Sequence, residues 1–274
     1  MTIIGLGNAG CNVAEKFEKI DGVKVISIDV DIEGEHCISV KECNSPEEYE
    51  NTFPDISEEL KYCDDKIFLV VGGSGRISGA SLSLLKQLRH KQINVIYIKP
   101  DTSILDKEEM MQEKLVFNVF QEYARSGMFN RCILIDNLCV EKLLGDVPII
   151  GFYDKLNDVI FNALGFVLTH ETKSGIVNNL QQLKDSERIC TVGFFDLTSD
   201  QESLLYELQN VSSKHFYFVF GEEQLKTDGG LSKKLKNLVQ NKTDENTKSS
   251  YIVYASKQPE EYSFMIAFSK HIQP

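Results

Sequence analysis

Short apolar runs rich in β-branched residues alternate with helical patterns through the first half of the chain. Strands are predicted at Thr2–Ile4, Val23–Ile28, Ile67–Val71, Ile93–Ile98 and Cys132–Ile135. These runs are apolar on both sides and are separated by crossover segments, which is typical of a parallel sheet covered by helices on both faces. The pattern therefore predicts an α/β fold with a doubly wound parallel sheet.

The second half begins with a long amphipathic pattern. Apolar residues recur at helical spacing from Phe152 to Phe166, so we expect one helix over about residues 152–170. A polar segment follows, and a smaller α+β domain is expected after it. The chain is accordingly divided into residues 1–151, a core helix and its following loop over residues 152–185, and a C-terminal domain over residues 186–274.

The last part of the chain combines strand and helix signals. Strands are expected at Ile189–Phe195, His215–Phe220, Tyr251–Ala255 and Tyr262–Ser269, with the last two as a closing pair. Ser199 and Glu202 have the spacing of a capping box, which predicts a helix that runs to about Val211. The spacing of Leu231, Leu235 and Leu238 predicts a further helix.

Charge and cysteine content narrow the class of partner. The 274 residues include 41 acidic and 29 basic side chains, and the formal net charge of −12 disfavours direct binding to nucleic acid or to an anionic membrane surface. The seven cysteines form no C-x-x-C pair, which argues against disulfides and zinc and favours the reduced cytoplasm. The histidines are scattered, so no protein metal site is expected. The longest apolar stretch, near Val159–Leu168, is too short to span a bilayer.

A glycine-rich turn follows the first predicted strand, with glycines at positions 5, 7 and 10, and a helix is expected to begin near Cys11. In this context backbone N–H groups and the helix dipole favour an anion such as phosphate. The same spacing is the dinucleotide fingerprint, and Asp29 lies 19 residues beyond Gly10, where a ribose-binding acid is expected. An NAD(P)-linked Rossmann enzyme and a glycine turn without a ligand both stay open.

A second glycine-rich turn, over residues 72–79, leads into a helix expected at Ser81–Leu88. Two such turns at the carboxyl ends of neighbouring parallel strands can hold one phosphate chain from both sides, whereas a dehydrogenase needs only the first. The pair favours a nucleotide other than NAD. The Walker signature is absent, and Arg76 stands where a nucleophile elbow needs glycine.

These motifs together resemble the tubulin/FtsZ superfamily, more closely on the FtsZ side, over roughly residues 2–185. Residues 4–12 resemble its first phosphate loop, and Gly73–Ala80 resembles its signature loop. Residues 26–31 fit its second strand, and residues 133–137 and 157–160 resemble its passage from strand to core helix. The resemblance implies a divergent FtsZ-like or phage/plasmid tubulin-like protein that binds GTP or GDP, optionally with Mg²⁺.

The resemblance also implies which residues hold the nucleotide. The phosphates would lie against Gly7, Asn8, Ala9, Gly10, Gly73, Ser74, Gly75, Arg76, Ile77, Ser78 and Gly79. Asn12 and Asp158 would hydrogen bond with guanine, Asn157 would lie beside it, and Tyr153 would stack on it. A carboxylate suits guanine because N1–H and the exocyclic amine are two adjacent donors. The alternative for Asp158 is a solvated helix residue.

Two stretches depart from the family pattern. Arg76 and Ile77 replace a threonine and a glycine of the signature loop. Arg76 would either supply charge to the phosphates or block the site in an ion pair. After the core helix, the family carries an N-L-D-F-A-D pattern whose acids enter the next subunit's site and help to position the hydrolytic water. The matching stretch, Asn178–Leu183, has Leu180 and Leu183 at the acidic positions, and Asp185 is close but displaced.

We therefore expect weak or absent hydrolysis and assign no catalytic residue, because a carboxylate that could orient or deprotonate water is missing. The leading hypothesis is a GTP-binding subunit of a cytomotive or cytoskeletal filament, assembled head to tail. The alternatives are a non-polymerising nucleotide-binding interaction protein of the same fold and an NAD(P)-linked enzyme.

Overall fold

A computed structural model describes residues 1–171 and 173–274 of the chain. The chain divides into two units, Met1–Phe161 and Asn162–Pro274. The boundary falls inside the long helix α7 (Phe152–His170), which is the helix expected over residues 152–170. Each unit has its own buried strands and is described separately.

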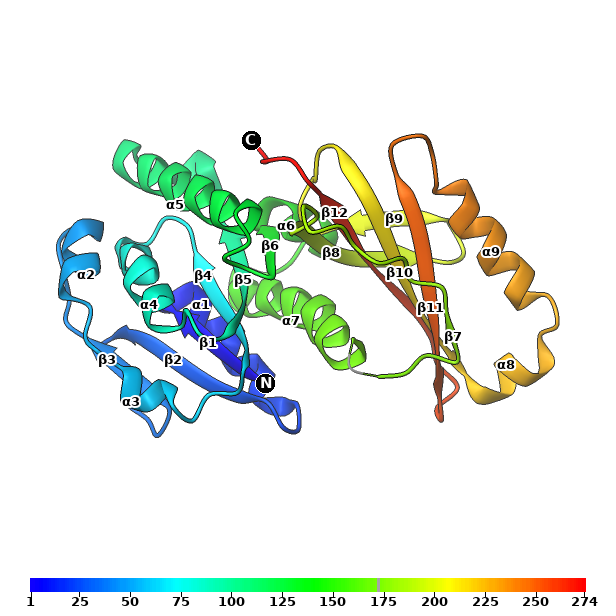
Figure 1. Ribbon diagram of the computed structural model, residues 1–274, viewed down its shortest axis with the longest axis horizontal. Helices are drawn as coiled ribbons and strands as arrows, with labels where there is room; N and C mark the ends of the chain where they lie inside the picture. Colours follow the sequence, from blue (N-terminus) through cyan, green and yellow to red (C-terminus); the bar gives the residue numbers. More distant parts are fainter. Residues whose placement is uncertain (172) are drawn as a thin grey trace. The chain divides into compact units, whose positions relative to one another are not determined.

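The first unit is built on parallel strands in the order β3-β2-β1-β4-β5-β6. Their bounds are β1 (Thr2–Leu6), β2 (Lys24–Val30), β3 (Cys37–Val40), β4 (Lys66–Gly72), β5 (Gln92–Lys99) and β6 (Arg131–Asp136). Every neighbouring pair in this order is parallel. The central strands are almost wholly buried, because helices lie over both faces of the sheet. The predicted parallel α/β architecture is confirmed (Figure 1).

Helices connect these strands. They are α1 (Gly7–Glu15), η1 (Lys16–Lys19), α2 (Pro46–Thr52), α3 (Ser57–Leu60), η2 (Arg76–Ala80), α4 (Ser81–Gln87), η3 (Thr102–Ile104), α5 (Lys107–Arg125) and α6 (Asn137–Leu144). Helix α1 packs against β1, β2 and β4, whereas α5 contacts β5 and β6. The expectation that the first helix begins near Cys11 was wrong, because the glycine turn itself forms the first turn of α1.

The second unit contains a mixed sheet in the order β8-β12-β10-β11-β7, with β9 on β8. Its elements are β7 (Val177–Asn178), β8 (Ile189–Asp196), β9 (Gln201–Leu204), β10 (Val211–Gly221), α8 (Glu222–Thr227), α9 (Leu231–Asn241), β11 (Lys248–Ser256) and β12 (Glu261–Ser269). Leu231 and Leu235 of α9 pack with Phe216 and Phe218 of β10, which forms an apolar core. Helices α8 and α9 follow one side of these strands (Figure 1).

The helix predicted from Ser199 to Val211 was wrong. Asp196 accepts hydrogen bonds from the N–H groups of Thr198 and Ser199 at 2.7 and 3.2 Å, which closes a turn after β8. The chain then returns as β9, antiparallel to β8. Glu202 pairs with Lys214 at 2.6 Å, so its side chain does not complete a capping box. A tertiary ion pair and strand pairing override the local capping signal here.

The closing strands were predicted as strands correctly, but their expected pairing with each other was wrong. β10 lies between them, parallel to β11 and antiparallel to β12. The chain between β10 and β11 contains α8 and α9. Such a crossover returns the chain to the same end of the sheet and therefore produces a parallel neighbour.

Glu187, just before β8, is hydrogen bonded to β10. This buried carboxylate accepts hydrogen bonds from the hydroxyls of Ser212 and Ser213, each at 2.7 Å, and from the N–H of Lys184 at 2.8 Å. Burial acts to raise the pKa of Glu187, but these donors together outweigh it and hold the pKa below its usual range.

We expect Glu187→Gln to lower the free energy of unfolding by about 1–3 kcal/mol at about pH 7, because charge-assisted hydrogen bonds are lost. Because the folded pKa is depressed, the carboxylate stabilises the protein above its unfolded pKa, and this contribution disappears as pH falls through the folded pKa. Urea unfolding of both proteins should therefore give a smaller difference at about pH 3 than at about pH 7. An equal difference at both values would contradict this account.

Candidate nucleotide site

The two glycine-rich turns lie next to each other in the first unit. They follow the adjacent parallel strands β1 and β4, in which Leu6 is opposite Val71. A Cβ added to Gly72 would lie 3.2 Å from the Cβ of Ala9, so the two turns leave no room for a larger side chain at Gly72. The fold brings together the turns that the sequence placed some 65 residues apart, roughly the separation of Gly7 and Gly72.

The first turn leaves the amino-terminus of α1 open. Gly7 begins the helix with φ of +71°, a conformation that favours glycine. Leu6 precedes it in an extended conformation, and none of the described side chains caps the helix or places an acid in its first turn. Asn8 and Ala9 are exposed. Unpaired N–H groups and the positive end of the helix dipole therefore face solvent, which suits an anion.

The second turn is held in place from behind. Ser78 is buried, its N–H donates to the carbonyl of Gly75 at 2.9 Å, and its hydroxyl accepts from Nε2 of Gln112 on α5 at 3.1 Å. The hydroxyl also donates to the carbonyl of Gly73 at 3.5 Å, so it links the turn to α5 and to its own backbone. Gln112 was missed by the sequence reasoning, since nothing in its local pattern indicates a contact with a turn about 34 residues earlier.

Ile77 covers the first turn. A Cβ added to Gly7 would lie 2.5 Å from Cγ2 of Ile77, and one added to Gly75 would lie 3.8 Å from the same atom. The methyl group thus occupies the space directly over Gly7, between the two turns. A glycine at position 77 would leave this space free, so the isoleucine narrows the gap in which an anion could contact both turns.

The two charged side chains near the turns, Arg76 and Asp29, differ in the contacts that they make. Arg76 is exposed and forms no salt bridge with any residue that the structure describes, so the ion pair that would block the site is not formed. Asp29, at the end of β2, accepts a hydrogen bond from the N–H of Val30 at 2.8 Å. One oxygen of the Asp29 carboxylate is therefore already occupied by a hydrogen bond from the neighbouring backbone.

The residues expected at the base lie on α1 and α7. Nζ of Lys16 lies 2.7 Å from Oδ1 of Asp158, which joins the end of α1 to α7. The lysine side chain is mostly buried and the carboxylate is about half exposed, so one face of the pair is open to solvent. Phe17 and Phe161 pack edge to face beside it, with ring centroids 5.0 Å apart.

Three further residues expected at the base lie on the same two helices, α1 and α7. Asn12 is exposed on α1 and donates from Nδ2 to Oδ1 of Asn8 at 3.1 Å. Asn157 is half-buried beside Asp158 on α7. Tyr153 is 67% exposed, and its ring and that of Phe152 meet edge to face with centroids 5.3 Å apart, so most of the tyrosine ring is open to solvent.

Lys16 was missed by the sequence reasoning, although a signal was present. It stands four residues after Asn12 on the same helix face, so any contact between Asn12 and a base would place Lys16 nearby. The pair of ammonium and carboxylate presents a donor beside an acceptor. Guanine has the complementary pattern, with acceptor O6 beside donor N1–H, whereas adenine has the reverse.

No protein-family model and no curated protein sequence matches this chain. Solved structures do resemble it. The FtsZ dimer of M. jannaschii has a TM-score of 0.71 at 15% identity, over 98% of this chain and 87% of that chain. A GTPγS-form protofilament of TubZ from Bacillus thuringiensis serovar israelensis has a TM-score of 0.72 at 14% identity, over 100% and 87%. CetZ from Methanosaeta thermophila has a TM-score of 0.70 at 15% identity, over 98% and 85%.

The chain has a tubulin/FtsZ-like fold. Within this fold, Cys11 lies under the first turn, and its thiol donates to the carbonyls of Gly5 and Ile28 at 3.5 and 3.6 Å. Burial raises the pKa of Cys11 to about 12. The thiol is therefore a packing group of the tubulin/FtsZ-like core and not a nucleophile.

The loop expected to carry catalytic acids lies in the second unit of this tubulin/FtsZ-like chain. Asn178 belongs to β7 and accepts the N–H of Leu180 at Oδ1, 3.0 Å away. Leu180 and Leu183 are half-buried, and Asp185 is exposed. Glu187 is committed to two serines, so Asp185 is the carboxylate of this loop that remains open to solvent.

The described residues contain neither a metal-binding cluster nor a membrane-spanning helix. Across residues 1–171 and 173–274, no cluster of three or more His, Cys, Asp or Glu side chains could hold a metal ion. Over the same described residues, no helix combines the length and the apolar character needed to cross a membrane.

The contact between Ile77 and Gly7 can be tested by stability. Gly7→Ala introduces strain at positive φ and a clash, so it should lower the free energy of unfolding by about 2–4 kcal/mol. In an Ile77→Ala background only the backbone strain should remain, about 1–2 kcal/mol. Gly22→Ala is the matched control, because φ there is +79° and an added Cβ meets nothing within 4 Å. Its cost should be the same in both backgrounds; an equal cost for Gly7→Ala in both would contradict the contact.

Proposed function

We propose that this chain is a divergent tubulin/FtsZ-like protein that binds GTP or GDP and assembles head to tail into filaments, with weak or absent GTP hydrolysis. The observation that carries this proposal is the open amino-terminus of α1 beside the second glycine turn. Backbone N–H groups can bind an anion there even though the whole chain has a formal charge of −12.

The residues expected to contact the nucleotide base favour guanine. The pair of Lys16 and Asp158 offers a donor beside an acceptor at 2.7 Å, which complements O6 and N1–H of guanine. The exposed ring of Tyr153 offers a stacking surface. Mg²⁺ would be held chiefly by phosphate oxygens, since it favours oxygen ligands and keeps several waters. A cytoplasmic location agrees with the cysteine pattern.

The second candidate function is a nucleotide-binding interaction protein that does not polymerise. The feature that bears on it is Ile77, whose methyl group narrows the space between the turns, so a bound phosphate chain would contact both turns less closely than in a loop with glycine at this position. The NAD(P)-linked enzyme has less support, because Asp29 already accepts a hydrogen bond from its own backbone.

Nucleotide binding can be tested with Asp158→Asn. The natural protein should be stabilised against heat by GTP and GDP and not by ATP or NADH. Asp158→Asn should weaken GTP binding about 10- to 100-fold, because a charge-assisted hydrogen bond is lost, and should improve binding of xanthosine triphosphate, whose O2 accepts from an amide. Asp154→Asn, one turn earlier and exposed on the same helix, is the control and should change nothing. Binding of NADH without GTP would decide for the dehydrogenase.

Assembly has structural support in both units. Ile149 and Ile150, just before α7, are 94% and 93% exposed, and Ile176 and Val177 of the second unit are 58% and 40% exposed. Exposed apolar side chains of this kind often mark interfaces. Two different patches on one chain allow a heterologous contact, which generates open filaments. Similar structures include a protofilament and a two-stranded filament of TubZ.

The assembly prediction uses Ile149→Asp/Ile150→Asp. At high protein concentration with a non-hydrolysable GTP analogue, the natural chain should sediment as filaments and this variant should stay in the supernatant, because burying charge at a contact is unfavourable. Met128→Asp changes another exposed apolar side chain and should sediment like the natural chain. A natural chain that remains monomeric would favour the non-polymerising alternative.

Hydrolysis can be tested by restoring an acid. Phosphate release by the natural chain under assembly conditions should be slow or absent, since Leu180 and Leu183 stand at the acidic positions. Leu183→Asp should raise the release rate, whereas Gln182→Asp, which places an acid at the neighbouring position, should not. Brisk phosphate release by the natural chain would overturn the argument from the missing acids.

A further inference from the structure

The outer edge of β2 is open along Lys24–Ile26. β3 pairs with β2 only from Ser27, which lies opposite Cys37, and the N–H of Ser27 donates to the carbonyl of His36 at 3.0 Å. On the other edge, the N–H of Lys24 donates to the carbonyl of Met1, also at 3.0 Å. Residues of a parallel strand bond alternately to its two neighbours, so Val25 faces outward, on the side where β3 has not yet begun.

Val25 is buried, yet its backbone is unpaired. The residue is 5% exposed. Among the described residues, none donates to its carbonyl or accepts from its N–H on the outer edge. Buried backbone groups are almost always paired, by protein or by another molecule. The N–H and the carbonyl of Val25 therefore both point outward from the strand edge and are available to hydrogen bond with another chain.

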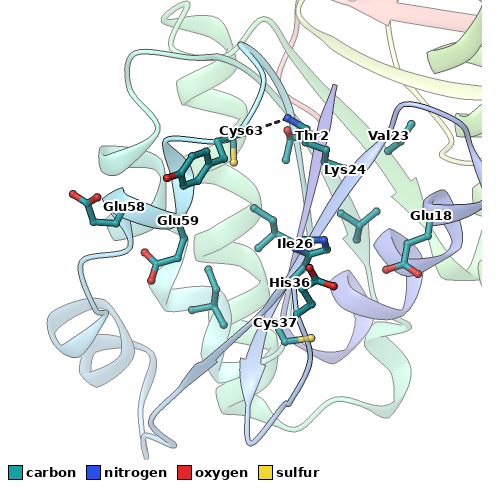
Figure 2. A pocket seen from close by; sticks show the side chains of 14 residues that line it. Thr2, Glu18, Val23, Lys24, Ile26, His36, Cys37, Glu58, Glu59 and Cys63 are labelled. Atoms are coloured by element: carbon teal, nitrogen blue, oxygen red, sulfur yellow. Dashed lines mark hydrogen bonds between the residues drawn. The ribbon is translucent and has the colours of Figure 1, made fainter.

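A cavity of about 940 Å³ surrounds this edge. Both Val25 and Ile26 line it, and because successive residues of a strand point to opposite faces, the cavity extends around the edge on both sides. Figure 2 shows side chains from both sides, with Cys63 and Glu59 on one and Glu18 on the other. The space therefore lies where a neighbouring strand would run.

The lining combines apolar side chains with negative charge. Carboxylates line the cavity at Glu18, Glu35, Glu58 and Glu59, and all four are exposed. Glu58 pairs with Lys61, so the uncompensated charge comes chiefly from the other three. The charge of Lys24 is locally compensated, because its Nζ donates to the carbonyl of Tyr62 at 3.0 Å and lies 3.8 Å from Asp64. The cavity therefore attracts cations and repels phosphate.

We propose that this cavity binds a short, extended, basic peptide segment of a partner protein, which adds to the open edge of β2 as a strand. Backbone groups of the peptide pair with the N–H and carbonyl of Val25. Apolar side chains of the peptide contact Val25 and Ile26, and Lys or Arg side chains reach the glutamates. The cavity lies near the amino ends of β1 and β2, whereas the glycine turns follow the carboxyl ends of β1 and β4, so this inference stands independently of the proposed nucleotide site.

The probe is the peptide acetyl-Lys-Val-Lys-Val-Lys-amide, with acetyl-Glu-Val-Glu-Val-Glu-amide as the charge control. The readout is amide hydrogen exchange at Val25, followed by NMR on the full chain. Saturating basic peptide should slow exchange at Val25 at least about tenfold, because a paired amide must open before it exchanges. The acidic peptide should not slow it. The basic peptide with both valines N-methylated lacks two donors and should bind more weakly.

Charge recognition is tested with Glu58→Lys/Glu59→Lys on α3, which should weaken binding of the basic peptide by at least about tenfold. The matched control is Glu222→Lys/Glu223→Lys on α8. That pair also lies in a helix's first turn, its Glu223 pairs with Lys226 as Glu58 pairs with Lys61, and the change in net charge is identical. Equal weakening by both variants, unchanged Val25 exchange at saturation, or equal binding of the acidic peptide would each overturn the proposal.

Discussion

The close packing of α1 against β1 and β4 is the constraint on which the candidate site depends. A Cβ on Gly10 would lie 2.4 Å from the carbonyl oxygen of Val70, and one on Gly5 would lie 2.6 Å from Cα of Cys11. The helix can approach the sheet this closely only because both positions lack a side chain. That approach places the amino-terminus of α1 beside the second turn, and it places Lys16, which directly follows α1, within reach of Asp158.

The same packing explains how much of the site could be predicted. The strands β1 and β4 were recognisable from their apolar runs, and glycine turns after adjacent parallel strands must meet at one edge of the sheet. Single-sequence patterns carry no information on which side chains then fill the space between the turns. The position of Ile77 over Gly7 and the anchoring of Ser78 by Gln112 are tertiary contacts, so they became visible only in the structure.

The two wrong predictions for the second unit also result from long-range contacts. Ser199 and Glu202 have a helix-start spacing, but Glu202 meets Lys214, on a strand that follows it in sequence, and the segment forms β9. Likewise, Tyr251–Ala255 and Tyr262–Ser269 are strands by composition, yet their partner is β10 because a helical crossover separates β10 from β11. Local propensity therefore indicated which segments are regular, and long-range pairing decided what they contact.

An acidic chain can bind an anion through groups that do not contribute to its net charge. At the carboxyl ends of β1 and β4, the donors are backbone N–H groups and a helix dipole, whose fields are local and independent of the side-chain balance. At the amino end of β2, the exposed glutamates express the acidic balance directly. The two ends of one sheet thus favour ligands of opposite sign. At the carboxyl ends of β1 and β4, Ile77 affects anion binding only through its shape. Its methyl group over Gly7 reduces the space for a ligand and removes no hydrogen-bond donor.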